Sequence, residues 1–235
     1  MMEQQIRFCT APDGVRIAYA TVGDGPPLVR AAHWLTHLEH DWHSPVWRHW
    51  LEELARHSTL IRYDERGCGL SDWQIDNLSF NTWVQDLEIV VETLGLRRFS
   101  LLGPSRGAAV AIAYAVRHPE KISHLILYGG FARGRFKRNA SQSQLDEAHA
   151  MLNLMKVGWG KDNPAFRQVF TSLFMPEGTL EEINGFNHLQ RISASPENAM
   201  RIETICYQID VCDLASQVTV PTLVLHARDD AIVPF

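Results

Sequence analysis

The sequence predicts an α/β fold with a mostly parallel central sheet, and three observations support this prediction. Short apolar runs of strand length alternate with helical segments through the first half of the chain. Clusters of glycine, proline and aspartate separate these runs, as turns do. The 235 residues contain no Gly/Ser linker, repeat or low-complexity tract, which favours one domain with an insertion.

The elements follow one another in a regular order. An opening hairpin is expected because Asp13-Gly14, a strong turn dipeptide, separates the β-rich runs 6–10 and 15–22. The helix expected at 79–94 carries apolar side chains at helical spacing and ends at Gly95. The other expected strands are 28–32, 58–63, 99–102, 121–128 and 220–226, and the other expected helices are 46–57 and 108–118.

The alternation stops at residue 131. Helical patches rich in methionine follow, and strand-like sequence returns only at 220–226. We interpret 131–213 as an inserted helical cap, with 1–130 and 214–235 as the α/β core. The methionines of the cap either line an adaptable apolar pocket or fill the core of the cap itself. They are Met151, Met155, Met175 and Met200.

Composition excludes several classes of protein. No apolar run approaches the roughly 20 residues needed to cross a bilayer. The N-terminus has no basic or apolar leader, so a cytoplasmic location is expected. The formal net charge of −5 argues against nucleic-acid binding. The four cysteines lack C-x-x-C spacing, which favours reduced thiols over a metal site.

Ser105 stands at the centre of Gly103-Pro104-Ser105-Arg106-Gly107, between an expected strand and an alanine-rich helix. Glycine two residues either side of a serine permits a tight, strained turn that exposes the hydroxyl. The pentapeptide alone is a weak signal, but the strand before it and the helix after it make it specific. Ser105 is therefore the candidate nucleophile, and the alternative is a serine that only caps the following helix.

Three segments together resemble the α/β-hydrolase superfamily, and they span nearly the whole chain. They are the serine turn, the loop 64–71 with the pattern D-x-R-G-x-G-x-S, and the stretch 226–234 ending in D-x-x-V-P. The likeness is to small bacterial serine esterases and to hydrolase-like domains fused to cyclases or regulators. The resemblance implies hydrolysis of small-molecule carboxylic esters, with no metal and no organic cofactor. Haloalkane or epoxide opening is disfavoured, because those members have aspartate where Ser105 stands.

The resemblance also implies a catalytic acid after the strand that follows the cap. That position is Asp230, four residues before Pro234, and Asp229 is the alternative. An oxyanion hole would use the backbone N–H of Arg106 and a second N–H from the loop after the 28–32 strand. Alignment nominates Trp34 as the second donor. This chain has histidine where the family usually has glycine, so His33 or Leu35 also remains open.

The family's general base is a histidine placed after the acid, but all eleven histidines of this chain precede Asp230. His33 and His37 are the candidates for a surrogate base, because their loop lies at the same sheet edge as Ser105. His226 is interpreted as shaping the turn of Asp230. The histidines after residue 32 lack a zinc-helix pattern, so no metal site is expected.

We expect the chain to lack the last strand and helix of its family. The strand at 222–226 would then be an exposed edge of unpaired N–H and C=O groups, which predicts a homodimer through that edge.

Arg133 to Arg138 is the one concentrated basic run. It is interpreted as a solvated face of the cap, with an anionic-substrate site as the alternative. The sequence thus predicts a carboxylesterase-type serine hydrolase, weak as the chain stands. The alternative is a catalytically impaired module that binds or senses a ligand.

Overall fold

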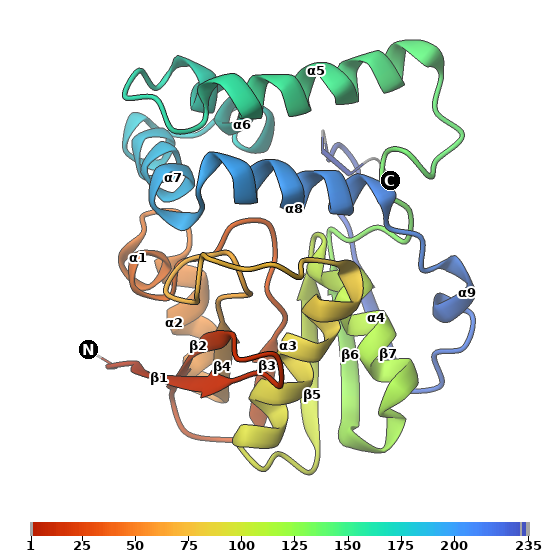
Figure 1. Cartoon of the computed structure of the whole chain (residues 1–235). Coiled ribbons are helices and arrows are strands. Elements are labelled where there is room, and N and C mark those ends of the chain that lie inside the picture. Colours follow the sequence, from red (N-terminus) through yellow and green to blue (C-terminus); the bar gives the residue numbers. More distant parts are fainter. Residues whose placement is uncertain (1, 231, 234–235) are drawn as a thin grey trace.

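The computed structural model describes residues 2–230 and 232–233 and shows a seven-stranded sheet in the order β1-β2-β4-β3-β5-β6-β7 (Figure 1). The hairpin β1-β2 is antiparallel, and β2 pairs antiparallel with β4. From β4 to β7 all neighbours are parallel, so the predicted α/β class is confirmed. The strands are β1 Gln5–Thr10, β2 Arg16–Val22, β3 Pro27–Arg30, β4 Thr59–Tyr63, β5 Phe99–Pro104, β6 Ile122–Tyr128 and β7 Thr222–Leu225.

Helices cover both faces of this sheet. Helices α3 and α4 pack on one face, and Leu51 and Ala55 of α2 are buried on the other face against strand residues such as Leu60. The sequence missed the short helix α1, which begins after a histidine N-cap. The helices before β6 are α1 Leu38–His43, α2 Arg48–His57, α3 Phe80–Thr93, α4 Gly107–Arg117 and the 3-10 turn Pro119–Lys121.

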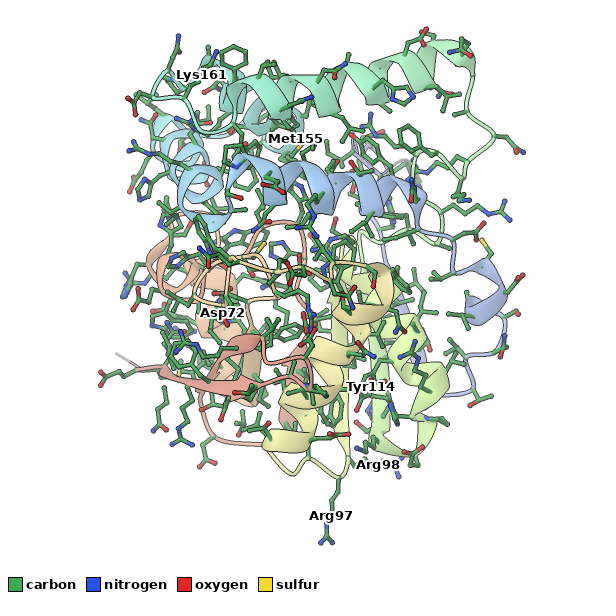
Figure 2. All side chains as sticks on the ribbon, in the orientation of Figure 1. Asp72, Arg97, Arg98, Tyr114, Met155 and Lys161 are labelled. Carbon is green, nitrogen blue, oxygen red and sulfur yellow. The ribbon has the colours of Figure 1, made fainter. Side chains whose placement is uncertain are left out.

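Between β6 and β7 the chain forms a helical layer, α5 to α8, which lies over the carboxyl ends of the parallel strands (Figure 1). Met155 is fully buried between α5 and α8, whereas Arg97 and Arg98 project from the opposite end of the molecule (Figure 2). Helix α9 then packs against α4. These helices are α5 Gln142–Gly158, α6 Ala165–Phe174, α7 Leu180–Ser193, α8 Pro196–Gln208 and α9 Cys212–Ala215.

The segments that enter and leave the helical layer run side by side. The Gly134 amide donates to the Ile209 carbonyl over 2.8 Å, and the Val211 amide donates to the Ala132 carbonyl over 2.9 Å. Arg133 and Asp210 form an antiparallel bridge and an ion pair of 3.3 Å within this crossing. The crossing is therefore a two-stranded tie between the helical layer and the sheet.

Strand β7 pairs only with β6 and forms one edge of the sheet within the described residues. Its apolar side chains are exposed: Leu223 by 52%, Val224 by 65% and Leu225 by 46%. None of the helices in the described residues combines the length and the apolar character that crossing a bilayer requires.

Candidate active site

Ser105 lies on the turn between β5 and α4, with its backbone in the left-handed region at φ +49°. Such a φ is unfavourable for a residue with a Cβ, and it is found where the surrounding structure holds it in place. The Ser105 amide donates to the Tyr128 carbonyl at the end of β6 over 2.8 Å. The side chain is partly exposed, as a nucleophile on such a turn requires.

The glycines of the serine motif permit close packing. A Cβ on Gly103 would lie 2.8 Å from the Cα of Ala108 and 2.8 Å from the Cβ of Ala111. A Cβ on Gly107 would lie 2.8 Å from the Ala32 carbonyl oxygen. The small residues therefore bring α4 against β5 and against the loop that follows β3.

The loop after β3 carries the predicted oxyanion donor Trp34. Its backbone turns at Leu35, which has a left-handed φ of +50°. Among the described residues, the amides of Arg106 and Trp34 have no hydrogen-bond acceptor. Both N–H groups can therefore donate a hydrogen bond to an oxyanion, as an oxyanion hole requires.

The Arg106 side chain joins three loops at this edge of the sheet. Its Nη2 donates to the His33 carbonyl oxygen over 2.9 Å and to Oε1 of Glu65 over 2.6 Å. Its guanidinium carbon lies 3.9 Å from the ring centroid of Trp83. Arg106 and Glu65 are each 1% exposed, and burial raises the pKa of Glu65 to about 7 although the guanidinium opposes this change.

Asp230 lies on the turn after β7. Its Oδ1 accepts from the amides of Ile232 and Val233 over 2.9 and 2.8 Å, so one carboxylate oxygen fixes its own turn. Its Oδ2 lies 3.9 Å from Nε2 of His226, and that ring nitrogen is also 2.7 Å from the Val233 carbonyl oxygen. The alternative acid, Asp229, is exposed.

His33 is 6% exposed and packs against the Trp47 ring. Its Nδ1 lies 2.9 Å from the Trp34 carbonyl oxygen, so that nitrogen carries the proton and Nε2 holds a lone pair. Nε2 is buried and has no hydrogen-bond partner among the described residues. Burial, with a contribution from the Arg30 guanidinium, holds the pKa of His33 well below its ordinary value. The other surrogate candidate, His37, instead caps α1 by accepting from the His40 amide.

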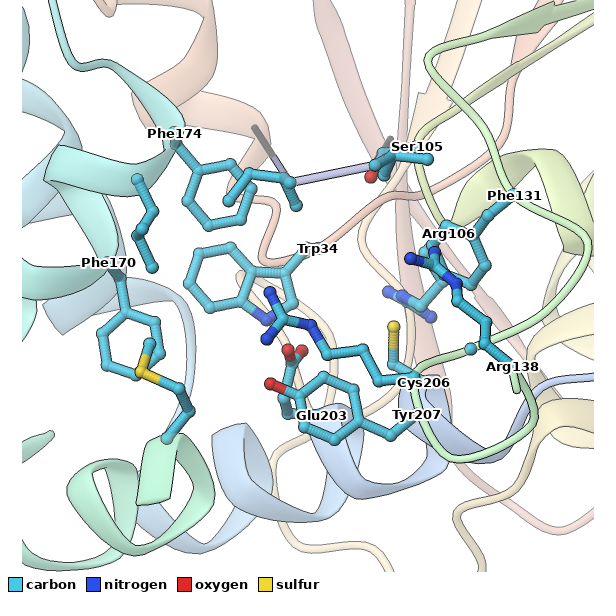
Figure 3. A pocket seen from close by; sticks show the side chains of 16 residues that line it. Trp34, Ser105, Arg106, Phe131, Arg138, Phe170, Phe174, Glu203, Cys206 and Tyr207 are labelled. Carbon is cyan, nitrogen blue, oxygen red and sulfur yellow. The ribbon is translucent and has the colours of Figure 1, made fainter. Parts of the chain in front are cut away.

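Two cavities meet at Ser105. The larger one, about 310 Å³, also contains His33, Asp229 and Asp230 in its wall. The smaller one, about 60 Å³, lies under the helical layer and includes Arg106. Trp34 and Phe174 belong to both walls and stack with ring centroids 4.9 Å apart (Figure 3). The structure thus brings the predicted residues Ser105, Arg106, Trp34, His33 and Asp230 to the walls of two adjoining cavities.

Other wall residues were not predicted from the sequence as part of the site. Trp47, Trp50 and Tyr128 add aromatic surface to the larger cavity, and Arg135 and Arg138 line the smaller one. Both arginines belong to the basic run 133–138 that stands out in the sequence, but the sequence does not tell which charges of the run face inward. Met151 of α5 lines the smaller cavity, so at least one of the four methionines named above contributes to a pocket wall.

Comparison with known proteins gives the same family by three routes. A family model for the alpha/beta hydrolase fold matches residues 38–176. The chain is 27% identical over 226 residues to pyrrolizixenacetamide deacetylase from Xenorhabdus hominickii, covering 93% of this chain and 79% of that protein. It is 28% identical over 205 residues to proline iminopeptidase from Lactobacillus helveticus, covering 79% and 69% respectively.

An esterase from Exiguobacterium antarcticum has a similar solved structure, with a TM-score of 0.82, 27% identity, and coverage of 98% of this chain and 84% of that chain. An esterase from Rhodococcus has a TM-score of 0.75 at 23% identity, covering 97% and 82%. These relatives are hydrolases of several substrate classes, and the matched family model spans more than half of the sequence. The chain belongs to the alpha/beta hydrolase fold family.

Proposed function

We propose that this chain is a serine hydrolase that cleaves small carboxylic esters through an acyl-enzyme intermediate at Ser105. The observation that carries the proposal is the left-handed φ of Ser105 on a strand-turn-helix, with Asp230 in the wall of the same cavity. A strained turn of this kind is maintained where it presents a reacting side chain. The esterase and deacetylase relatives support acyl transfer as the reaction class.

In the proposed reaction the Ser105 hydroxyl attacks the acyl carbon and gives its proton to an imidazole. The amides of Arg106 and Trp34 donate to the oxyanion of the tetrahedral intermediate. Collapse breaks the bond to the alcohol, which leaves with the proton. Water then attacks the acyl-enzyme by the reverse sequence and releases the acid.

His33 is the base that we propose for this sequence, since it is the one imidazole among the described residues in the walls of the two cavities. Its free Nε2 lone pair is suited to accept a proton. Its low pKa makes it a weak base, and its Nδ1 faces the Trp34 carbonyl rather than Asp230. We therefore expect slow turnover. Asp230 is the proposed acid in the wall of the same cavity, with Asp229 as its exposed alternative, but the group that orients His33 is the Trp34 carbonyl oxygen.

Labelling with a fluorophosphonate probe, followed by hydrolysis of 4-nitrophenyl esters, tests this proposal. The wild-type chain should be labelled at Ser105, and Ser105→Ala should lose both the labelling and the ester hydrolysis. Turnover that is unchanged in Ser105→Ala would remove Ser105 from the reaction.

A second candidate function is a hydrolase-like module that binds a ligand without chemistry. The contacts of Asp230 favour it, because the carboxylate contacts its own turn and His226 rather than His33. Such a module would be stabilised by ligands of the cavity but would not react with the fluorophosphonate. Covalent labelling at Ser105 would exclude it.

A further inference from the structure

The segment between β6 and α5 carries three arginines that differ in how their charges are matched. Arg133 pairs with Asp210 at 3.3 Å, and Arg135 pairs with Glu147 at 3.2 Å. Arg138 has no carboxylate within ion-pair distance among residues 2–230 and 232–233. Its Nε donates to the Arg133 carbonyl oxygen over 2.9 Å, which leaves both Nη groups without an acceptor in that part of the chain.

Arg138 lies in the wall of the smaller cavity, the same wall that contains Ser105. Its side chain reaches inward past Phe131 toward the centre of the site (Figure 3). The guanidinium carbon is 5.7 Å from the centroid of the Phe131 ring. Arg138 also borders an open groove of about 660 Å³ on the outer side. A ligand that extends from Ser105 toward the groove would therefore pass this guanidinium.

The other charges of the smaller cavity do not satisfy Arg138. Glu203 is the one carboxylate among the described residues of the wall, against the guanidinium groups of Arg106, Arg135 and Arg138. Arg106 is already bound to Glu65. Burial raises the pKa of Glu203, although the neighbouring Tyr207 and Arg135 side chains oppose this change. The wall is thus short of negative charge, and the unmatched cation is the one on Arg138.

We propose that the substrate carries a carboxylate remote from its ester group, and that Arg138 binds this carboxylate. This proposal rests on the ester hydrolysis proposed above. The two free Nη groups of a planar guanidinium match the two oxygens of a carboxylate, and a charge-assisted pair in a partly closed cavity is stronger than one in water. Monoesters of straight-chain dicarboxylic acids have this chemistry. Arg138 is a specificity residue in this scheme, since it contacts the substrate away from the reacting atoms.

Binding to the Ser105→Ala chain, which cannot form an acyl-enzyme, tests the proposal without any need for turnover. The probes are the monomethyl and dimethyl esters of succinic, adipic and suberic acid, measured by isothermal titration calorimetry. The series of lengths is needed to find the one that spans from the serine turn to Arg138. At that length the anionic monoester should bind about tenfold more tightly than the neutral diester, the factor expected for one charge-assisted hydrogen bond.

Two further substitutions in the Ser105→Ala chain test whether Arg138 causes the preference for the monoester over the diester. Arg138→Met keeps the apolar stem and should abolish the preference for the monoester. Lys137→Met removes the neighbouring charge, which is exposed and lines none of these cavities, and should retain the preference. Thermal unfolding of each variant verifies that it is folded.

Equal affinity for monoester and diester at every length would overturn the proposal, and so would millimolar monoester that fails to bind. Retention of the preference in Arg138→Met, or an equal loss in Lys137→Met, would also overturn it. Failure of the proposed hydrolysis would be seen differently. The wild-type chain would then not be labelled by the fluorophosphonate, but the affinities of the Ser105→Ala chain for monoester and diester would be unchanged.

Discussion

The side chain of Arg106 donates to the carbonyl oxygen of His33 over 2.9 Å, so the residue after the candidate nucleophile holds the loop that carries Trp34. The same Nη2 donates to Glu65 in the loop after β4. One buried guanidinium therefore fixes the spacing between the two amides proposed to bind the oxyanion. This spacing depends on the ion pair between Glu65 and Arg106 being intact.

We predict that breaking this ion pair costs much stability. Glu65→Met leaves the buried Arg106 guanidinium without its partner, which typically lowers the free energy of unfolding by about 3–5 kcal/mol. Arg106→Met leaves Glu65, whose pKa is already raised to about 7, as a buried carboxyl without its donor, which also lowers the free energy of unfolding. The double variant replaces both charges with apolar groups and should lose much less than the sum of the two single changes. Urea denaturation of the wild-type chain, the two single variants and the double variant measures this double-mutant cycle. Additive losses would show that the two side chains do not depend on each other.

The strained turn at Ser105 predicts an order of stability among inactive variants. Ser105→Gly relieves the left-handed φ of +49°, whereas Ser105→Ala retains a Cβ. The glycine variant should therefore be more stable than the alanine variant by about 1 kcal/mol, measured by chemical denaturation. An alanine variant as stable as the glycine variant would mean that the turn stores no strain.

The contact of Gly107 with the Trp34 loop should matter for reactivity. A Cβ on Gly107 would lie 2.8 Å from the Ala32 carbonyl oxygen and 3.3 Å from that of Ala31. Gly107→Ala should lower the free energy of unfolding by about 1–3 kcal/mol and slow labelling by the fluorophosphonate.

Gly95→Ala is the matched control, because Gly95 has open space around the Cβ position and a φ of +62°. It should cost about 1 kcal/mol through its backbone alone and leave the labelling rate unchanged. Equal labelling rates in Gly107→Ala and Gly95→Ala would show that the contact of Gly107 with the Trp34 loop does not affect the reaction of Ser105.

The buried His33 predicts a loss of stability in acid. Its pKa is lowered in the folded chain, so below the ordinary value of 6.5 the unfolded chain binds a proton that the folded chain does not. The contribution of His33 to stability is therefore complete above pH 6.5 and falls below it, by up to about 1.4 kcal/mol per pH unit. His33→Gln should have a smaller slope between about pH 5 and 6.5 in urea denaturation. If the wild-type chain and His33→Gln have the same slope of stability against pH, groups other than His33 cause the sensitivity to acid.

The exposed edge strand β7 predicts self-association of this 235-residue chain. Unpaired backbone groups beside apolar side chains favour pairing with a second copy. Sedimentation should detect a dimer that Val224→Lys weakens, since Val224 is 65% exposed on that edge. Leu180→Lys, at an apolar residue of α7 that is 74% exposed, should not change the dimer. A concentrated wild-type chain that remains monomeric would contradict this prediction.

Much of the fold could be predicted from the sequence because its signals are local. The hairpin depends on Asp13-Gly14, and the serine turn depends on glycines and alanines whose small size the packing uses. Helix α1 was missed, because it has only six residues and its N-cap is His37 rather than one of the usual capping residues. A short helix that needs tertiary contacts leaves little periodic pattern to read.

The site was harder to predict than the fold, because its details depend on contacts between distant segments. The sequence predicted a backbone role for Arg106, but its side chain meets Glu65 and Trp83 only after three loops converge. The sequence also gave no means to tell Arg138, which faces a cavity, from its exposed neighbour Lys137. A run of charges has no periodicity that records which members point inward.

The two-stranded tie between the helical layer and the sheet has a mechanical consequence. The incoming and outgoing segments are joined by the hydrogen bonds between Gly134 and Ile209 and between Ala132 and Val211, so they cannot move independently. The helical layer has a second attachment, because the Gly69 amide donates to the Ser193 carbonyl oxygen over 2.8 Å and the Asn198 side chain donates to the Trp73 carbonyl oxygen over 2.9 Å. Since Arg138 follows the tie in the chain and Ser105 belongs to the sheet, the two attachments together fix the separation of their side chains.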